Sequence, residues 1–158
     1  MRIGQGFDVH RFAADEGRPL VLGGVRIEGS PGLAGHSDAD VVAHAITDAV
    51  LGAAALGDIG THFPDTDPTY AGADSLVLLL KAVELAHGAA WVPVNADCTV
   101  IAERPRLAPH MAAMAEALTA VLGAPVSVKA ARGEGLGAIG RAEGIACMAV
   151  VLLGPVER

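Results

Sequence analysis

The residues of this sequence best suited to chemistry are one carboxylate and two histidines. Asp8 and His10 alternate in the extended stretch RIGQGFDVH, and residues i and i+2 of a strand point to the same face. His44 lies in DVVAHAITD among apolar residues, on one helical stripe with Asp40 and Asp48, so that an aspartate one turn away could hold its ring from behind. Two histidines and a carboxylate with a fourth position open are typical of catalytic zinc. The pattern predicts a metal centre, and the alternatives are an exposed polar strand end and a half-buried histidine.

Two loops add candidate ligand-binding groups. In GHSD, His36 stands beside the predicted start of a helix, where free N–H groups and the helix dipole favour anions. In GDIGTHFPDTDP, Asp58 is placed to bind a ribose hydroxyl and the FPDTD segment to bind a polar ligand. The alternatives are a histidine without a role and a turn-rich connector, because aspartate and glycine are common in turns.

The glycine-rich segment GLGAIG, residues 135–140, matches a dinucleotide-binding pattern, and we reject that function. Such a site needs a helix and a second strand after the glycines. Only 18 residues follow Gly140 in a chain of 158, and they read as a strand. We expect instead a turn that lets the backbone approach a ligand, with Glu134 and Arg141 on either side.

Elements of both kinds must position these residues. We expect strands over residues 2–12, 20–22, 25–27, 91–101, 126–131 and 144–153, and helices over 37–56, 75–87 and 109–122. Gly23-Gly24 predicts a hairpin turn, and Ser37 is expected to cap the first helix, with Asp40 three residues on. Strands and helices interleave without a strict repeat, so the sequence predicts an α/β or α+β layer fold with one mixed sheet.

Length, composition and charge restrict the class of protein. A chain of 158 residues, 52% of them hydrophobic, fits a single domain over residues 1–158 and excludes intrinsic disorder. A net charge of -7 with dispersed arginines argues against nucleic-acid binding. The apolar runs are too short to span a membrane, the N-terminus has no secretory signal, and two cysteines make no disulfide framework. We therefore expect a cytoplasmic protein.

Four segments, read in order, resemble one known family. RIGQGFDVH, GHSDADVVAHAITDAVLGAAALGDIG, HFPDTDP and GRAEGIA closely resemble the 2-C-methyl-D-erythritol 2,4-cyclodiphosphate synthases of the non-mevalonate isoprenoid pathway, over essentially the whole chain. The resemblance implies a homotrimer, in which each subunit turns a mixed sheet toward a central channel and packs its helices on the other face, with active sites between neighbouring subunits. It also implies conversion of 4-diphosphocytidyl-2-C-methyl-D-erythritol 2-phosphate to the 2,4-cyclodiphosphate with release of CMP.

The resemblance assigns roles to residues of this sequence. It implies zinc on Asp8, His10 and His44, with the substrate diphosphate as fourth ligand, and magnesium or manganese on Glu134, bridging the substrate phosphates. We expect catalytic roles for His36 and Arg132. Contacts to the cytidine diphosphate-linked substrate are expected from Asp8, His10, His36, Ser37, Asp58, Gly60, Phe63, Pro64, Asp65, Thr66, Asp67, Ala102, Arg106, Leu107, Ala108, Arg132, Gly133, Glu134 and Arg141. Of these, residues 36–37 match contacts to the methylerythritol phosphate end, 58 and 60 to ribose, 63–67 to methylerythritol, and 102–108 to cytosine.

The chain departs from the family pattern at three places. Arg132-Gly133 stands where the family has two threonines, Ala138 where an aromatic residue is expected near the channel, and Met148 where an acidic residue is expected. We expect Arg132 to neutralise diphosphate charge, and the alternative is that it points to solvent while Gly133 acts through its N–H group. Arg141 matches the position where three symmetry-related arginines can hold an isoprenyl diphosphate, so such a channel ligand is a further expectation.

The implied reaction needs no nucleophilic side chain. The 2-phosphate attacks the β-phosphorus of the CDP group, so the catalyst must neutralise charge and hold the attacking and leaving groups in line. Two metal ions do both, which agrees with a sequence in which we recognise no Ser-His-Asp or Cys-His arrangement. The rival functions are a metal-dependent phosphohydrolase, which releases CMP without a cyclic product, and a non-catalytic trimeric nucleotide-binding module, which has no need of a zinc-ligand set.

Overall fold

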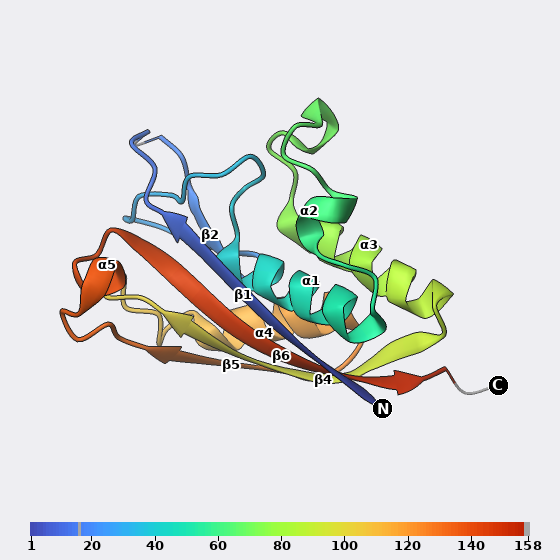
Figure 1. The fold of residues 1–158 in the computed structure, drawn as a ribbon. Coiled ribbons are helices and arrows are strands. Elements are labelled where there is room, and N and C mark those ends of the chain that lie inside the picture. Colours follow the sequence, from blue (N-terminus) through green and yellow to red (C-terminus); the bar gives the residue numbers. More distant parts are fainter. Residues whose placement is uncertain (16, 157–158) are drawn as a thin grey trace.

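A twisted four-stranded sheet forms one layer of the structure, a computed structural model that describes residues 1–15 and 17–156. The strands lie in the order β1 (Arg2–Arg11), β6 (Gly144–Pro155), β4 (Trp91–Ile101) and β5 (Val126–Ala131) (Figure 1). β6 is antiparallel to β1 and β4, whereas β4 and β5 are parallel, so the sheet is mixed, as predicted. β2 (Leu20–Leu22) and β3 (Val25–Ile27) form the predicted hairpin outside this sheet.

Helices cover one face of the sheet, which confirms the predicted fold class. α1 (Val41–Ala54) packs on β1 and β6, α4 (Met111–Leu122) packs on β5, and α3 (Ser75–Gly88) packs against α1 and α4. Short helical turns interrupt the segments for which the sequence predicts loops: α2 (Ile59–His62), η1 (Pro68–Tyr70) and α5 (Gly137–Gly140). The core lies between the two layers, where Ile46, Leu79, Met114, Leu118 and Val151 are fully buried.

The cap of α1 differs from the prediction. Asp40, and not Ser37, caps this helix, because one Asp40 oxygen accepts hydrogen bonds from two N–H groups of the first turn at 3.0 and 3.2 Å. The same carboxylate accepts hydrogen bonds from the N–H groups of Gly23 and Gly24 at 2.8 and 2.7 Å, and so ties the hairpin turn to the helix. The oxygens of Asp40 are therefore engaged elsewhere, and Asp40 is not the aspartate that the sequence predicts behind His44.

Two glycines let α1 approach β1 closely. Gly4, Gly6, Asp8 and His10 alternate along one face of β1, the face that α1 covers. A Cβ atom at Gly4 or at Gly6 would lie 1.9 or 1.8 Å from a backbone carbonyl oxygen of α1. No larger residue fits either position without moving the helix. This close packing brings His44 on α1 to the two polar residues that follow along the strand.

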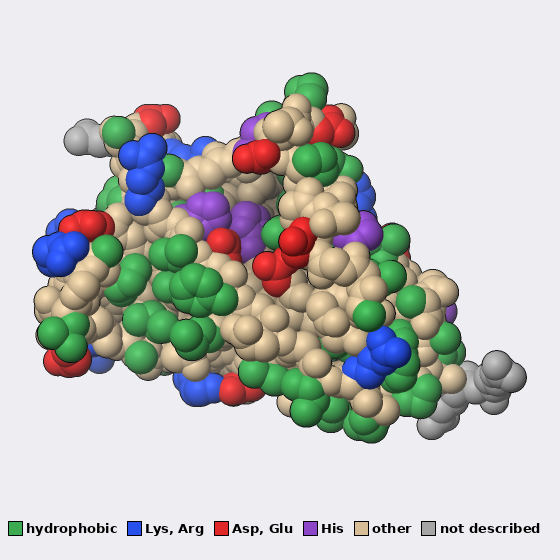
Figure 2. Space-filling model, in the orientation of Figure 1, with side chains coloured by type: hydrophobic (Ala, Val, Ile, Leu, Met, Phe, Trp, Pro, Cys, Tyr) green, Lys and Arg blue, Asp and Glu red, His purple; other side chains and the backbone are tan. Residues whose placement is uncertain are grey.

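The opposite face of the sheet is apolar and uncovered. Phe7 and Val9 on β1 are 49% and 50% exposed, and Met148 and Val150 on β6 are 50% and 47% exposed. Figure 2 shows apolar side chains gathered over these strands. Patches of this kind on a soluble protein mark interaction surfaces. Among the described residues, no helix has both the length and the apolar character needed to cross a bilayer.

Candidate metal centre and ligand hollows

Asp8, His10 and His44 meet where β1 passes under α1. The Oδ2 atom of Asp8 lies 3.0 Å from both His10 Nε2 and His44 Nδ1, and these two nitrogens are 3.3 Å apart. Tetrahedral zinc with bonds of about 2.0–2.2 Å places its ligand atoms about 3.3 Å from one another. The three predicted ligands therefore already have the spacing that a single tetrahedral ion requires.

Neighbouring groups determine which nitrogen of each ring is free. The carbonyl oxygen of Ala34 lies 2.7 Å from His10 Nδ1, so Nδ1 donates its proton there and Nε2 keeps its lone pair in the neutral ring. On His44 the roles are reversed, because Nε2 lies 2.9 Å from the hydroxyl of Ser75 and 3.1 Å from that of Ser37, while Nδ1 faces the carboxylate. Two ring lone pairs and a carboxylate oxygen repel one another unless a cation lies among them. The donor set therefore fits a metal ion.

The ionisation of these groups favours positive charge at the same point. Burial alone would raise the pKa of Asp8, but the close contacts of its carboxylate with the rings of His10 and His44 outweigh burial and hold this pKa well below its usual range. The hydrogen bond with Asp8 raises the pKa of His10, against the opposing effect of burial. Negative charge on Asp8 and a proton on His10 therefore stabilise each other, and a metal ion that binds at this point displaces such a proton.

A hollow of about 430 Å³ opens over the metal ligands, and we call it the metal-centre hollow. Figure 2 shows histidine side chains beside acidic groups in a depression at the centre of this face. Other predicted substrate contacts also line the hollow: His36, Ser37, Gly60, Phe63, Pro64 and Asp65. The structure thus brings together the three metal ligands and six further residues that lie apart in the sequence.

Three residues of the same loops lie outside this hollow. Asp58 caps α2 and accepts hydrogen bonds from the N–H and hydroxyl groups of Thr61 at 2.8 and 2.7 Å. Asp67 caps η1 and accepts a hydrogen bond from the N–H of Thr69 at 2.9 Å, and Thr66 is exposed beside it. Both aspartates therefore shape the loops, and their predicted contacts to ribose and methylerythritol stay predictions.

A second hollow, of about 390 Å³, lies where β4 and β5 end, and we call it the β4–β5 hollow. Four predicted residues line it: Ala102, Arg106, Leu107 and Arg132. Arg132 is 66% exposed and forms an ion pair with Glu103, and this pair lowers the pKa of Glu103. Four more predicted residues line neither this hollow nor the metal-centre hollow: Ala108, Gly133, Glu134 and Arg141.

The width of the sheet separates these two hollows. In the strand register, Asp8 pairs with Cys147, Cys147 with Val100, and Val100 with Ala130. Three strand spacings of about 4.8 Å place Asp8 and Ala130 about 14 Å apart. None of the described residues lines both hollows. Within one chain, the metal ligands and the predicted cytosine contacts therefore do not share a cleft.

The glycine-rich turn beyond β5 closes on itself. A Cβ at Gly133 would lie 2.6 Å from the backbone nitrogen of Gly140, and a Cβ at Gly140 would lie 2.3 Å from the carbonyl carbon of Gly135. Between them Glu134 has a positive φ of 51°, and after them Arg141 pairs with Glu143 at 2.6 Å. Gly133 and Gly140 are therefore required by contact between backbone segments.

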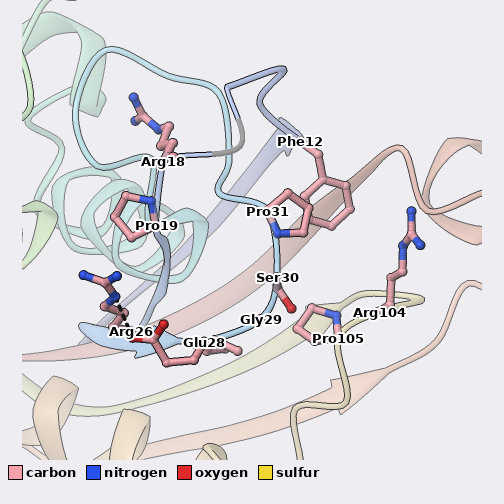
Figure 3. A pocket seen from close by; sticks show the side chains of 12 residues that line it. Phe12, Arg18, Pro19, Arg26, Glu28, Gly29, Ser30, Pro31, Arg104 and Pro105 are labelled. Carbon is pink, nitrogen blue, oxygen red and sulfur yellow. Dashed lines mark ion pairs between the residues drawn. The ribbon is translucent and has the colours of Figure 1, made fainter.

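A third hollow, of about 590 Å³, lies beside the hairpin and is lined by none of the predicted site residues. Figure 3 shows it, with Phe12 among its lining side chains. Arg26 pairs with Glu28 at 2.8 Å, and Arg18 donates a hydrogen bond to the carbonyl oxygen of Ser37. These cations are engaged with the chain itself and do not converge on one point, so we assign no ligand to this hollow.

Two residues near the metal centre, Ser75 and Asp38, are not among the predicted site residues. Ser75 is completely buried at the start of α3, and its hydroxyl lies between the ring of His44 and the carboxylate of Asp38. Local sequence marks Asp74 and Ser75 only as residues of a kind that caps helices, and Asp74 holds that position in the structure. The contact between Ser75 and His44 joins residues 31 positions apart in the chain, and no local sequence pattern reveals it.

Comparison with known proteins agrees with this geometry. The YgbB family matches residues 1–154. A 2-C-methyl-D-erythritol 2,4-cyclodiphosphate synthase from Bordetella petrii is 57% identical over 155 residues, which are 96% of this chain and 94% of the relative. The bifunctional IspDF from Campylobacter jejuni has a TM-score of 0.93 at 43% identity, covering 99% of this chain and 42% of its own. An IspF from Plasmodium falciparum, solved as a CDP complex, has a TM-score of 0.84 at 36% identity, covering 99% and 97%. The resemblance read from the sequence is thereby confirmed, and the chain belongs to the YgbB family.

Proposed function

We propose that this protein converts 4-diphosphocytidyl-2-C-methyl-D-erythritol 2-phosphate to 2-C-methyl-D-erythritol 2,4-cyclodiphosphate and CMP. This is a phosphorus–oxygen lyase reaction of non-mevalonate isoprenoid biosynthesis. The observation that carries the proposal is the set of Asp8, His10 and His44, spaced for one ion beneath a hollow, in a chain that is 57% identical to a synthase of that name. An IspF solved with CDP supports the cytidine diphosphate part of the substrate.

We assign one zinc ion per subunit to Asp8, His10 and His44, and magnesium or manganese to Glu134. A single protein carboxylate suits magnesium, which usually takes its other ligands from phosphates and water. When bound, the two ions neutralise the phosphates and polarise the phosphorus under attack. Arg132 adds a permanent positive charge two residues before Glu134 in the chain. The negative net charge of the protein therefore does not oppose an anionic substrate locally.

The remaining site residues orient the substrate. His36 and Ser37 lie beside the metal ligands and bind the phosphate at the methylerythritol end, with His36 acting directly at the reacting group. The 63–67 segment covers the methylerythritol group and keeps water from the phosphorus. Asp58 and Gly60 bind the ribose, residues 102–108 bind the cytosine end, and Gly133 contacts the phosphates through its backbone N–H. Orientation matters most here, because attacker and leaving group belong to one molecule and must be in line.

We propose that a complete site forms between two copies of the chain in a homotrimer. The β4–β5 hollow of one subunit then faces the metal-centre hollow of its neighbour. Two observations support this assembly: the hollows are separate within one chain, and the uncovered sheet face exposes Phe7, Val9, Met148 and Val150. A closed ring of three copies would bury that face around a central channel. Sedimentation equilibrium at micromolar concentration checks the assembly, and a monomer would exclude it.

Phosphorus NMR of the products tests the proposed reaction directly. Incubation with 4-diphosphocytidyl-2-C-methyl-D-erythritol 2-phosphate, zinc and magnesium should yield CMP and a cyclic diphosphate in equal amounts. CMP with an open-chain phosphate instead would indicate a phosphohydrolase. Metal-independent CDP binding without turnover would indicate a nucleotide-binding module.

Metal analysis tests the ligand set separately. Purified protein should contain about one zinc per chain, as expected for a site with three protein ligands. His44→Ala should remove the zinc, because only Asp8 and His10 would remain. A His44→Ala protein that kept its full zinc content would show that the ligand set is wrong.

We further propose that the channel of the trimer accepts an isoprenyl diphosphate on three copies of Arg141. Ala138 stands there in place of an aromatic residue, and Met148 stands in place of an acidic residue. The cavity should therefore be wider and less acidic than is usual in the family. Native mass spectrometry with added isoprenyl diphosphate should show the complex, and absence of binding would exclude it. We also propose a cytoplasmic location, which the two free, buried cysteines, Cys98 and Cys147, support.

A further inference from the structure

We infer that Asp38 and Ser75 are positioning residues that fix the proton on the ring of His44, so that Nδ1 stays free for the metal. The inference rests on the proposed metal site and adds two residues behind it. Ser75 is buried at the first position of α3, and Asp38 lies in the loop before α1. Neither residue touches the point where the ion would bind, so both would act through His44.

The contacts form a chain from carboxylate to ring. The hydroxyl of Ser75 donates a hydrogen bond to Asp38 Oδ1, and the backbone N–H of Ser75 donates one to Asp38 Oδ2 at 3.2 Å. The same Ser75 oxygen lies 2.9 Å from His44 Nε2. On the far side of the ring, His44 Nδ1 lies 3.0 Å from Asp8 Oδ2. One imidazole therefore connects the metal ligands to a second carboxylate.

The direction of the protons follows from the chemistry of each group. An ionised carboxylate only accepts hydrogen bonds, so the Ser75 hydroxyl proton must point to Asp38. The Ser75 oxygen can then only accept at its other side, so His44 Nε2 must carry the ring proton. In a neutral ring this leaves the lone pair on Nδ1, which is the nitrogen that faces Asp8. Histidine ligands of metals are commonly held in this way by a second set of groups.

Ser37 does not replace Ser75 in this role. Its hydroxyl oxygen lies 3.1 Å from the same His44 nitrogen, and it accepts a hydrogen bond from the N–H of Ala39 at 3.1 Å. No contact between Ser37 and a carboxylate fixes the direction of its proton, whereas Ser75 has Asp38. The carboxylate thus distinguishes the two serines.

Backbone hydrogen bonds hold Asp38 in place. Its N–H donates a hydrogen bond to the carbonyl oxygen of Ala73 at 3.0 Å, and the N–H of Gly72 donates one to the carbonyl oxygen of His36 at 2.8 Å. The loop before α1 and the loop before α3 are thus joined by two backbone bonds besides the Asp38–Ser75 contacts. The relay is therefore part of a fixed junction between two loops that border the metal-centre hollow.

Zinc affinity of the zinc-free full-length protein, measured by competition with a chromogenic chelator, tests the inference. Ser75→Ala and Asp38→Asn should each weaken zinc binding by about ten- to a hundredfold, the usual loss when a group behind a metal-binding histidine is removed. Thr47→Val is the matched control. It removes a different buried hydroxyl, on α1, which donates its hydrogen bond to the carbonyl oxygen of Ala43 at 2.8 Å and not to His44. This variant should keep the zinc affinity of the wild type.

A second readout separates positioning from general structural damage. In zinc-loaded wild-type protein, the ring N–H proton of His44 should give a slowly exchanging low-field proton resonance, and Ser75→Ala should shift or lose it. If Ser75→Ala does not fold, Asp38→Asn decides, because the amide keeps the shape of the carboxylate and removes its charge. Unchanged zinc affinity in a folded variant, or an equal loss in Thr47→Val, would overturn the inference. Wild-type protein that binds no zinc would instead refute the proposed metal site.

Discussion

Mixing two inactive variants should restore activity if each site takes its parts from two subunits. His44→Ala removes a zinc ligand at the metal-centre hollow, and Glu134→Ala removes the proposed second metal ligand beyond β5. The register places Asp8 and Ala130, the latter near the end of β5, about 14 Å apart across the sheet, with no shared lining residue between the two hollows. Each variant alone should be inactive, because all of its sites lack one metal ligand.

The extent of recovery follows from counting subunits. In a cyclic trimer assembled at random from equal amounts of both variants, a site works when its zinc ligands come from a Glu134→Ala subunit and its Glu134 comes from a His44→Ala subunit. Each condition holds for half of the subunits, so about one quarter of the sites should be complete in a closed ring. The mixed protein should therefore release CMP at about one quarter of the wild-type rate per subunit, if working sites are independent.

The assay requires proof that subunits have mixed. The two variants carry tags of different mass, are refolded together, and native mass spectrometry records the mixed trimers before CMP release is measured. A mixture of His44→Ala with Asp8→Ala, both altered at the same hollow, serves as the control and should stay inactive. Mixed trimers of His44→Ala and Glu134→Ala without activity would show that each site lies within one chain, and the composite site would be abandoned.

Three further perturbations have defined outcomes. Gly6→Ala places a methyl group against a carbonyl oxygen of α1. It should lower the free energy of unfolding, measured by chemical denaturation, by about 1–3 kcal/mol and should also weaken zinc binding. An unchanged denaturation midpoint would contradict the packing argument. In zinc-free protein, the raised pKa of His10 stabilises the fold below about pH 6.5, and this stability is lost as the pH rises through the raised pKa. The lowered pKa of Asp8 stabilises the fold above about pH 4, and this stability is lost on acidification. Stability should therefore be greatest between these limits, whereas zinc affinity should rise with pH because zinc displaces the His10 proton. Denaturation and zinc titration across pH check both slopes. Above about pH 6.5 the slopes should have opposite signs, and parallel slopes in that range would refute the reasoning. Arg132→Ala should lower kcat by about ten- to a hundredfold at saturating magnesium and increase the magnesium requirement, and a wild-type rate would make Arg132 a surface residue paired with Glu103.

The sequence predicts elements well where local chemistry decides them. The hairpin at Leu20–Ile27 and the strand at Val126–Ala131 have the predicted bounds. The two glycines of its turn define the hairpin, and alternating valines mark the strand. Helix ends are less predictable, because several residues can cap a helix. Asp40 caps α1 in place of Ser37, since the glycines of a distant hairpin also bind its carboxylate. Likewise α4 starts at Met111 and not at residue 109, and α1 ends at Ala54 and not at residue 56.

The site shows the same division between local and distant information. Asp8 and His10 are recognisable because a strand places alternate residues on one face, and His44 because a histidine stands out in an apolar helix. The role of Ser75 is not recognisable, because it depends on the packing of α3 against α1, which joins residues far apart in the chain. Nor can the sequence pattern show that Asp40 faces the hairpin and not His44. Local spacing therefore finds the ligands and misses the groups that orient them.

The glycines under α1 affect how the activity of related sequences can be read. Every substitution at Gly4 or Gly6 adds a side chain where the helix backbone already lies. A related chain could therefore retain Asp8, His10 and His44 and still hold them too far apart for one ion. An intact set of ligands is then not sufficient for assigning activity to such a chain. Two positions without any functional group have to be inspected along with the three that have one.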